Sequence, residues 1–291
     1  MQNIINGLPI AAVILLLAVG FAFLVKGADF FVEGSSSIAK KLKVPPIIIG
    51  LTIVAMGTSL PETAVSVTAS LVQNNELAVS NVVGSNIFNL MFVIGVCSIL
   101  TPIMVQKATV VRDIPLSLGC ALFLLVLGIS GLGDKTGMTL GHADGVIFLI
   151  VFAGYIFTMV RSAMKARAAG QKVEIEGVEE CDNMKELSYG KSILFLIVGA
   201  AAIAFGGDLT VDTASRIAIE LGMSQTLVGL TIVSIGTSLP ELVTSVVAAR
   251  KNEVDMAVGN AVGSNIFNIL MVLGISSAIS PVALIRENII D

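Results

Sequence analysis

The sequence predicts an all-α polytopic membrane protein, and composition, segment length and internal duplication are the observations that predict it. Its 291 residues are 55% hydrophobic and 13% charged, with a mean hydropathy of +0.94. Soluble domains carry about 25% charged residues. Uncharged stretches such as residues 8–25 are long enough for a membrane-spanning helix, which needs about 20 residues. The apolar runs are continuous and do not alternate with period two, which argues against a transmembrane barrel.

Charges and turn residues divide the chain into eight hydrophobic segments. They cover about residues 8–38, 44–72, 77–101, 114–132, 144–161, 191–221, 225–249 and 256–279. The N-terminus has no basic region and no small-residue cleavage site, so the first segment is predicted to be a retained helix. We predict a first transmembrane repeat over 1–161 (helices 1–5), a cytoplasmic linker loop over 162–190, and a second transmembrane repeat over 191–291 (helices 6–8).

The two halves are copies of one another. A constant shift of 179 residues aligns them from Gly27 to Pro102 without a gap, and residues 50–62 match 229–241 at 11 of 13 positions. The hexapeptide GTSLPE at 57–62 recurs at 236–241, and GSNIFN at 84–89 recurs at 263–268. The unit is too long for a solenoid repeat, so the sequence describes a duplicated transmembrane bundle.

The distribution of basic residues indicates how the copies lie in the membrane. Connections after the first, third and fifth segments are rich in Lys and Arg, whereas those after the second and fourth carry mainly acids. The basic connections are therefore predicted to be cytoplasmic, with the N-terminus outside a cytoplasmic (inner) membrane. Because five segments separate equivalent helices, the second copy enters the membrane in the opposite orientation. Such inverted repeats are characteristic of secondary transporters with a site near the membrane midplane.

The GTSLPE motif places a carboxylate, two hydroxyls, glycine and proline inside apolar segments. Ser59-x-x-Glu62 with Pro61 in the first turn also fits a capping box that starts a half-helix. Within hydrocarbon, the freed backbone groups and the charge are costly, the charge alone by about 2.5–3.5 kcal/mol. A bound cation offsets both costs. Pseudo-two-fold symmetry brings Glu62 and Glu241 together, and their all-oxygen surroundings suit Ca²⁺ or Na⁺ and not zinc or copper.

The GSNIFN motif supplies further oxygen atoms. Ser85 and Asn89 are four residues apart and share one helical face, and Ser264 and Asn268 repeat the arrangement. Small-residue helix packing with amides bonded between helices is the alternative interpretation. Beside a repeated carboxylate motif, we predict that these side chains are additional cation ligands.

Two copies of GTSLPE and GSNIFN in inverted repeats resemble the cation/Ca²⁺ exchanger superfamily, and within it the prokaryotic sodium/calcium exchangers. The resemblance covers both repeats. It implies ten helices, with ion sites between helices two, three, seven and eight, and exchange of Ca²⁺ for Na⁺ by alternating access. Helices one and six are implied to slide across a fixed core. The repeat register places the last two helices at about residues 282–340, so eight are expected here, with an apparently incomplete second repeat.

The resemblance also implies a ligand set. Glu62 and Glu241 match the two glutamates that bind Ca²⁺ and share the Na⁺ sites. The other implied contributors are threonines that offer a carbonyl to Ca²⁺ and a hydroxyl to Na⁺, the serines and amides of both motifs, and two positions with backbone carbonyls: Thr58, Thr237, Ser59, Ser238, Ser85, Ser264, Asn89, Ala55 and Ser234. Asn268 stands where some members carry Asp. Because it is neutral, it favours a potassium-independent exchanger and leaves two carboxylates.

Several functions remain open on the sequence alone. Two carboxylates balance one Ca²⁺ and are overfilled by three Na⁺, so competition between these loads predicts an antiporter. A proton-coupled Ca²⁺ exchanger is the main alternative, and a passive cation channel is a further one. The sequence contains no H-E-x-x-H motif and no nucleophile elbow that would indicate an enzyme. Beyond Ca²⁺, Na⁺ and the lipid bilayer, no cofactor or nucleic-acid partner is expected, and the oligomeric state stays open.

Overall fold

The computed structural model describes residues 5–284 except 6, 73–74, 104, 108, 131–137, 169–186, 225–227, 229–230 and 233. The described residues form long helices and one two-stranded antiparallel sheet, in which β1 (Thr139–Leu140) pairs with β2 (Val282–Ala283). The first half contains α2 (Ile10–Leu42), α3 (Pro46–Ile49), α4 (Ala55–Thr58), α5 (Leu60–Leu71), α6 (Asn75–Ile87), α7 (Ile94–Leu100), α8 (Ile114–Ser130) and α9 (His142–Ala168). The second contains α10 (Tyr189–Glu220), α12 (Ser234–Thr237), α13 (Leu239–Arg250), α14 (Val254–Phe267) and α15 (Leu273–Ile279).

Short π-helical turns connect several of these helices into continuous spans. They are η1 (Gly50–Val54), η2 (Phe88–Val93), η3 (Thr109–Asp113) and η5 (Asn268–Val272). The η2 and η5 turns occupy equivalent places in the two copies, between α6 and α7 and between α14 and α15. Single π turns inside α-helices are frequent at functional sites, and both of these turns contain an asparagine of the GSNIFN motif.

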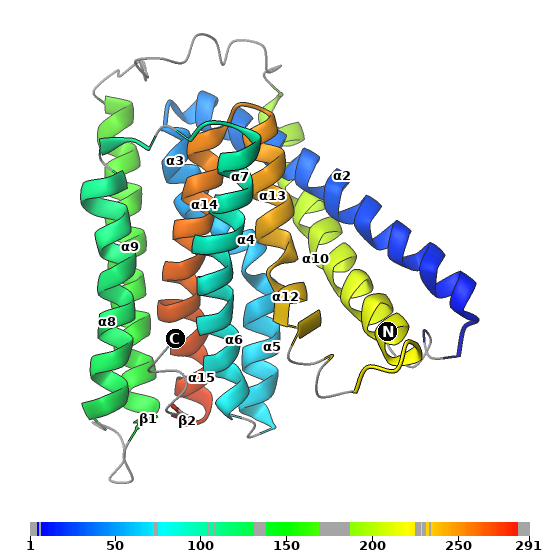
Figure 1. Ribbon diagram of the computed structural model, residues 1–291. Coiled ribbons are helices and arrows are strands. Elements are labelled where there is room, and N and C mark those ends of the chain that lie inside the picture. The colour runs from blue at the N-terminus through cyan, green and yellow to red at the C-terminus, as the bar shows by residue number, and fades with distance from the viewer. Residues whose placement is uncertain are drawn as a thin grey trace.

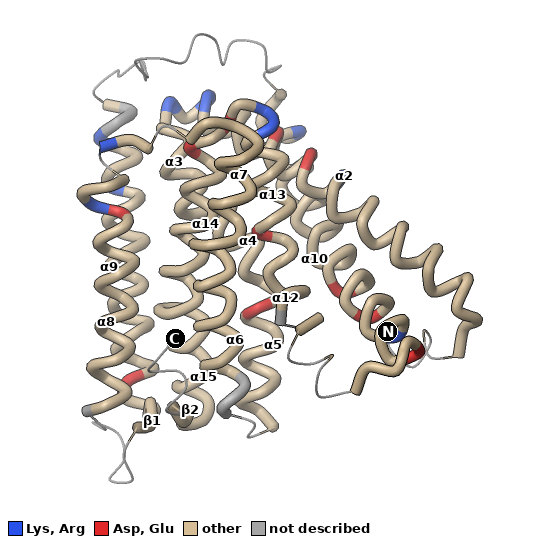
Figure 2. The backbone as a smooth tube through the Cα atoms, in the orientation of Figure 1, with Lys and Arg blue, Asp and Glu red and all other residues tan. Residues whose placement is uncertain are grey.

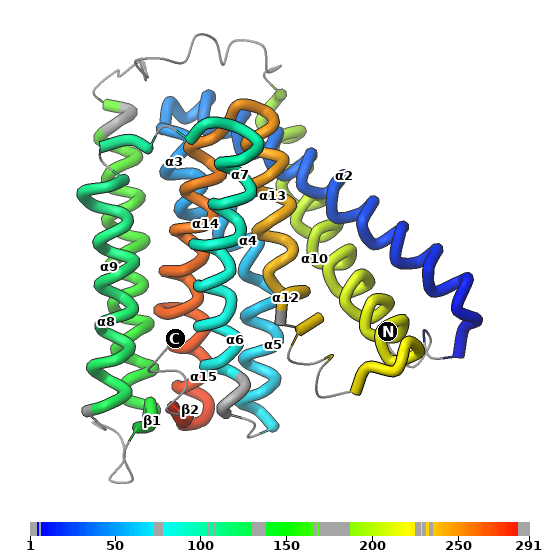
Figure 3. The backbone as a smooth tube through the Cα atoms, in the orientation of Figure 1, coloured from blue at the N-terminus to red at the C-terminus, as the bar shows by residue number. Residues whose placement is uncertain are grey.

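Seven of the eight predicted membrane spans are present in the described part of the chain. Six helices there are long and apolar enough to cross a bilayer, and the pair Pro46–Thr58 and Leu60–Leu71, bent by 47°, adds a seventh. The remaining expected segment, 225–249, lies partly outside the described residues, and within it α12 and α13 repeat the break of the first copy. Figure 3 shows both interrupted helices in the middle of the bundle.

The two copies run in opposite directions, as the odd number of intervening segments predicted. In Figure 1, α5 runs toward the end of the bundle that holds β1 and β2, and α13 runs toward the opposite end. The same reversal relates α2 to α10 and α6–α7 to α14–α15. The fold is therefore an inverted repeat of transmembrane helices.

Helix α2 packs mainly against α10, and glycines make this contact close. A Cβ atom on Gly27 would lie 2.9 Å from the backbone nitrogen of Ile203, and one on Gly206 would lie 2.7 Å from that of Leu24. Gly27 and Gly206 are equivalent residues of the two copies, so the interface is itself nearly symmetric. Close backbone approach through small residues is how membrane helices form tight pairs, and α2 and α10 form such a pair.

The centre of the bundle is the α14–α15 helix. Every residue from Met256 to Phe267 is buried, because α14 contacts the first-copy helices α3, α4, α6 and α8 together with α13. Lysines and arginines instead gather at one end of the bundle, where α2, α9 and α13 end (Figure 2). The middle of the bundle thus consists of apolar residues around the two repeated motifs.

Candidate ion-binding site

The GTSLPE motif breaks its helix in both copies. Helix α4 ends at Thr58 and α5 begins at Leu60, with Ser59 between them at φ −82° and ψ 9°. Ser238 has nearly the same conformation, with φ −92° and ψ 3°, and proline follows in the first turn in both copies. The half-helix start predicted from proline and glycine is therefore present.

The capping-box interpretation of the motif serine is wrong. Ser59 and Ser238 occupy the N-cap positions, but neither side chain caps its own helix. Ser59 Oγ donates to Glu241 Oε1 at 3.2 Å, and Ser238 Oγ donates to Glu62 Oε1 at 3.3 Å. Each serine thus binds the carboxylate of the opposite copy, because the inverted repeat places the two breaks back to back.

Both motif carboxylates are fully buried. Glu62 and Glu241 have no exposed surface and lie in the first turns of α5 and α13. Ser85 adds a hydroxyl to Glu62 Oε1 at 3.3 Å. None of the ion pairs among the described residues involves either carboxylate. Two desolvated carboxylates near one another without a basic partner are very unfavourable unless a cation or proton joins them.

The unsatisfied atoms of the site are all acceptors. Within the described part of the chain, Glu62 Oε2, Glu241 Oε2, Asn89 Oδ1 and Asn268 Oδ1 are buried without a hydrogen-bond partner. Buried polar atoms are nearly always partnered in folded proteins. Four orphan oxygen atoms, two of them on carboxylates, match the ligand preference of hard cations such as Ca²⁺.

The side-chain nitrogens of Asn89 and Asn268 donate to protein acceptors, which leaves the amide oxygens of both residues without a partner. Asn89 Nδ2 donates to Asn265 Oδ1 at 3.1 Å, and Asn268 Nδ2 donates to Ser85 Oγ and to Asn86 Oδ1, each at 3.1 Å. Because each amide nitrogen faces protein acceptors, its oxygen is left to another ligand. The prediction that Asn89 and Asn268 lie with the carboxylate motif agrees with this arrangement.

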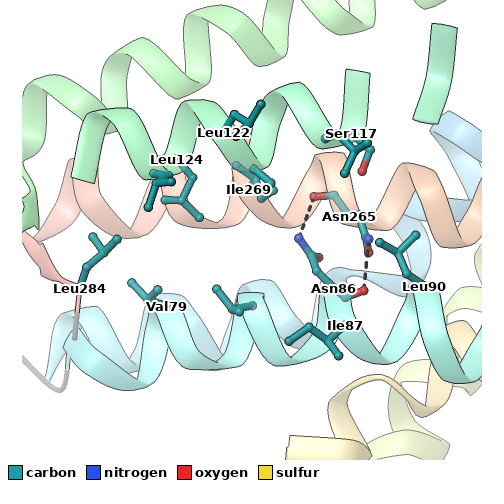
Figure 4. Close-up of a pocket in the computed structure, with 14 residues that line it drawn as sticks. Val79, Asn86, Ile87, Leu90, Ser117, Leu122, Leu124, Asn265, Ile269 and Leu284 are labelled. Atoms are coloured by element: carbon teal, nitrogen blue, oxygen red, sulfur yellow. Dashed lines mark hydrogen bonds between the residues drawn. The ribbon is translucent and has the colours of Figure 1, made fainter. Parts of the chain in front are cut away.

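Asn86 and Asn265, by contrast, bond the two copies to each other. Asn265 Nδ2 donates to the carbonyl of Asn86 at 3.2 Å, and Asn86 Nδ2 donates to the carbonyl of Asn265 at 3.4 Å. Together with Ser117, the pair forms the polar part of a mainly apolar cavity of about 450 Å³ between α6, α8 and α14 (Figure 4). The helix-packing interpretation of the motif amides therefore holds for these two residues.

The threonines of the GTSLPE motif, Thr58 and Thr237, are buried beside other residues of the two motifs. Thr58 Oγ1 is 3.4 Å from Ser264 Oγ, and both residues are fully buried. The carbonyl of Ala55 accepts from the Ser59 backbone N–H at 3.0 Å and lies 3.3 Å from Thr58 Oγ1. Thr237 is buried in the second copy. Ser234 begins α12, and its side chain lies outside the described residues.

The sequence reasoning missed two buried asparagines. Asn81 Nδ2 donates to Ser66 Oγ at 3.1 Å, and Asn260 Nδ2 donates to Ser245 Oγ at 2.9 Å. Both amides contact the helix that follows a break. A signal for them was present, because Asn81 precedes Ser85 by four residues on the same helical face and recurs as Asn260 in the second copy.

Comparison with known proteins identifies the family. The model of the family described as sodium/calcium exchanger protein matches residues 12–161 and 191–291. The chain belongs to the sodium/calcium exchanger family. Its fold and motifs are therefore those of an antiporter family of transporters, not of enzymes, and the resemblance inferred from the motifs is confirmed.

Individual relatives and solved structures agree with this assignment. The putative antiporter CaxA of Alkalimonas amylolytica is 40% identical over 263 residues, covering 90% of this chain and 79% of CaxA. The sodium/calcium exchanger MaX1 of Methanosarcina acetivorans is 35% identical over 292 residues, covering 92% of this chain and 83% of MaX1. A structure of the sodium-calcium exchanger NCX_Mj soaked with Na⁺ and Sr²⁺ superposes with a TM-score of 0.80 at 33% identity, covering 97% of this chain and 87% of that one.

Proposed function

We propose that this antiporter exchanges Ca²⁺ for Na⁺ across the cytoplasmic membrane by alternating access. The observation that carries the proposal is the pair of fully buried carboxylates, Glu62 and Glu241, surrounded by orphan oxygen acceptors and without a basic partner among the residues that the structure describes. The ligand set that we propose is the one expected from the motifs: Glu62, Glu241, Thr58, Thr237, Ser59, Ser238, Ser85, Ser264, Asn89, Asn268, Ala55 and Ser234.

Charge balance supplies the physical basis for exchange at this site. Two carboxylates neutralise one Ca²⁺, and the neutral Asn268 adds no further charge. Na⁺ ions are attracted by the same two charges, so Na⁺ and Ca²⁺ cannot both occupy the site at full charge without strong repulsion. Each ion therefore enters when the other leaves. The neutral Asn268, at a position where some family members carry Asp, supports an exchanger that does not require potassium.

The contact between the α2–α10 pair and the two breaks supports alternating access. A Cβ atom on Gly57 would lie 2.5 Å from Cζ of Phe31 on α2, and one on Gly236 would overlap Cγ2 of Val211 on α10. The motif glycines thus let side chains of the pair lie directly over the interrupted helices. Movement of the pair as a unit would uncover the site from one end or from the other.

The orientation in the membrane follows from the basic end of the bundle. Lysine and arginine gather where α2 and α13 end, and basic residues favour the cytoplasmic side. This supports an outside N-terminus and a cytoplasmic linker at 162–190. The family model matches two blocks, 12–161 and 191–291, which supports a division into repeats at 1–161 and 191–291.

Uptake of ⁴⁵Ca²⁺ into vesicles that contain the protein tests this function. Vesicles loaded with Na⁺ and diluted into Na⁺-free medium should accumulate Ca²⁺, and a pH gradient alone should not drive uptake. Uptake driven by the pH gradient and indifferent to Na⁺ would replace the proposal by proton-coupled exchange. Uptake that needs no counter-ion gradient would indicate a channel.

A further inference from the structure

Asn260 on α14 is a fully buried amide that joins the two copies of the fold. Its nitrogen donates to Ser245 Oγ at 2.9 Å and to the backbone carbonyl of Glu241 at 3.3 Å. On the opposite side of the same amide, Thr58 Oγ1 lies 3.0 Å from Asn260 Oδ1. The nitrogen therefore contacts the second copy, and the oxygen contacts a site residue of the first.

Asn81 on α6 repeats the arrangement in the other direction. Its nitrogen lies 3.1 Å from Ser66 Oγ and 3.5 Å from the backbone carbonyl of Glu62. Its oxygen accepts from Thr237 Oγ1 at 3.3 Å. Each site threonine is thus bonded to an asparagine of the opposite copy, and each asparagine also bonds the carbonyl of a site glutamate.

The backbone carbonyl of Glu241 fixes the orientation of the Asn260 amide. A backbone carbonyl can only accept, so the side of the Asn260 amide that faces Glu241 must be its NH₂ group. The side that faces Thr58 is then the amide oxygen, which also can only accept. The single hydroxyl proton of Thr58 has Asn260 Oδ1 as its nearest acceptor, at 3.0 Å. The Ala55 carbonyl lies at 3.3 Å and Ser264 Oγ at 3.4 Å. A proton donated to Asn260 leaves the lone pairs of Thr58 Oγ1 for another partner.

We propose that Asn81 and Asn260 are positioning residues that turn the two site threonines into cation ligands. A hydroxyl proton that pointed into the site would repel a cation, whereas a proton held by an amide oxygen leaves lone pairs that attract one. This inference rests on the proposed ion-binding function and adds residues that act on the ion only through Thr58 and Thr237. Each copy of the fold thereby orients a ligand of the other.

Displacement of bound ⁴⁵Ca²⁺ by Na⁺ on the purified full chain tests the inference without any transport measurement, because the hydroxyl is the threonine group expected to bind Na⁺. Asn260→Leu should weaken Na⁺ binding by about five- to tenfold, the net effect of one neutral hydrogen bond. In the double variant with Thr58→Val, the loss should be smaller than the product of the two single losses, because no hydroxyl is left to orient. The matched control is Asn260→Leu combined with Thr237→Val, where the losses should multiply.

The possible outcomes separate the inference from the function beneath it. If the losses of affinity from Asn260→Leu and Thr58→Val multiply in the double variant, the inference is overturned. It is also overturned if Asn260→Leu couples as strongly to Thr237→Val as to Thr58→Val. If Asn260→Leu does not fold, Asn81→Leu provides the same test in the other copy, because Asn81 Oδ1 accepts from Thr237 Oγ1. Its cycle with Thr237→Val should be non-multiplicative, and multiplying losses there also overturn the inference. Wild-type chain that binds no Ca²⁺ would instead contradict the proposed function itself.

Discussion

Replacement of Glu62 by Gln removes one of the two buried charges while keeping the shape of the side chain. At an effective dielectric constant of about 20, two unit charges 4 Å apart interact by about 4 kcal/mol, so a divalent cation loses about 8 kcal/mol. The variant also avoids burying the carboxylate, which offsets part of this loss. Even half of that figure, about 4 kcal/mol, corresponds to roughly a thousandfold weaker Ca²⁺ binding.

The measurement is Ca²⁺ affinity of the purified protein, followed by Na⁺-driven ⁴⁵Ca²⁺ uptake in vesicles. Glu62→Gln should bind Ca²⁺ at least about a hundredfold more weakly and show no exchange, and Glu241→Gln should do the same because the two residues are symmetric. Glu220→Gln is a matched control, since Glu220 is paired with Arg216 near the end of α10 and is 46% exposed. A loss of less than tenfold for either buried glutamate would refute the assignment of the site.

Three further predictions concern the α2–α10 pair and the charge of the site. Asn268→Asp adds a third carboxylate, so the apparent Ca²⁺ affinity should rise at least about tenfold. The maximal rate of exchange should fall, because Ca²⁺ leaves the site more slowly. Unchanged uptake kinetics would count against Asn268 as a ligand. Gly57→Ala places a methyl group against Phe31 and should slow exchange. Adding Phe31→Ala to the same chain should restore the exchange rate. Failure to restore it would argue against contact of α2 with the helix break during transport. Lys251→Gln removes the 3.3 Å ion pair with Asp29 that joins the end of α13 to α2, and because the pair is partly exposed, Ca²⁺ affinity from the basic end should change by less than about fivefold. A change above thirtyfold in everted vesicles would show that this pair controls access far more strongly than its exposure allows.

The duplication made the central features of the site predictable from the sequence. Gly57 and Pro61, repeated at 236 and 240, indicated where the helices break, and the structure has both breaks at the serine between them. The burial of Glu62 and Glu241 followed from their place in apolar segments. Such inferences succeed because a carboxylate or a helix break inside hydrocarbon has few stable arrangements.

Contacts between the copies were not predictable in the same way. The pattern around Ser59 fits a local capping box, and only the back-to-back arrangement shows that its hydroxyl binds Glu241. The same applies to Asn81, whose partner Thr237 is 156 residues away. A constant sequence shift identifies equivalent residues, but it does not tell which faces of two distant helices meet.

The differences between the copies also depend on tertiary context. Lys251 pairs with Asp29 at one end of the bundle, whereas the residues equivalent to them are Val72 and Asp208, which have no such pair. Likewise α14 is buried along its length, while Met91, which follows the equivalent helix α6, is 74% exposed. Sequence symmetry therefore predicts the site better than it predicts the surroundings of the site.

The position of a bound Ca²⁺ ion tests the central claim most directly. Anomalous diffraction from crystals grown with Ca²⁺ should show one peak between Glu62 and Glu241, about 2.3–2.6 Å from an oxygen atom of each. A peak bound to one carboxylate alone, a peak elsewhere in the bundle, or no peak at saturating Ca²⁺ would contradict the account.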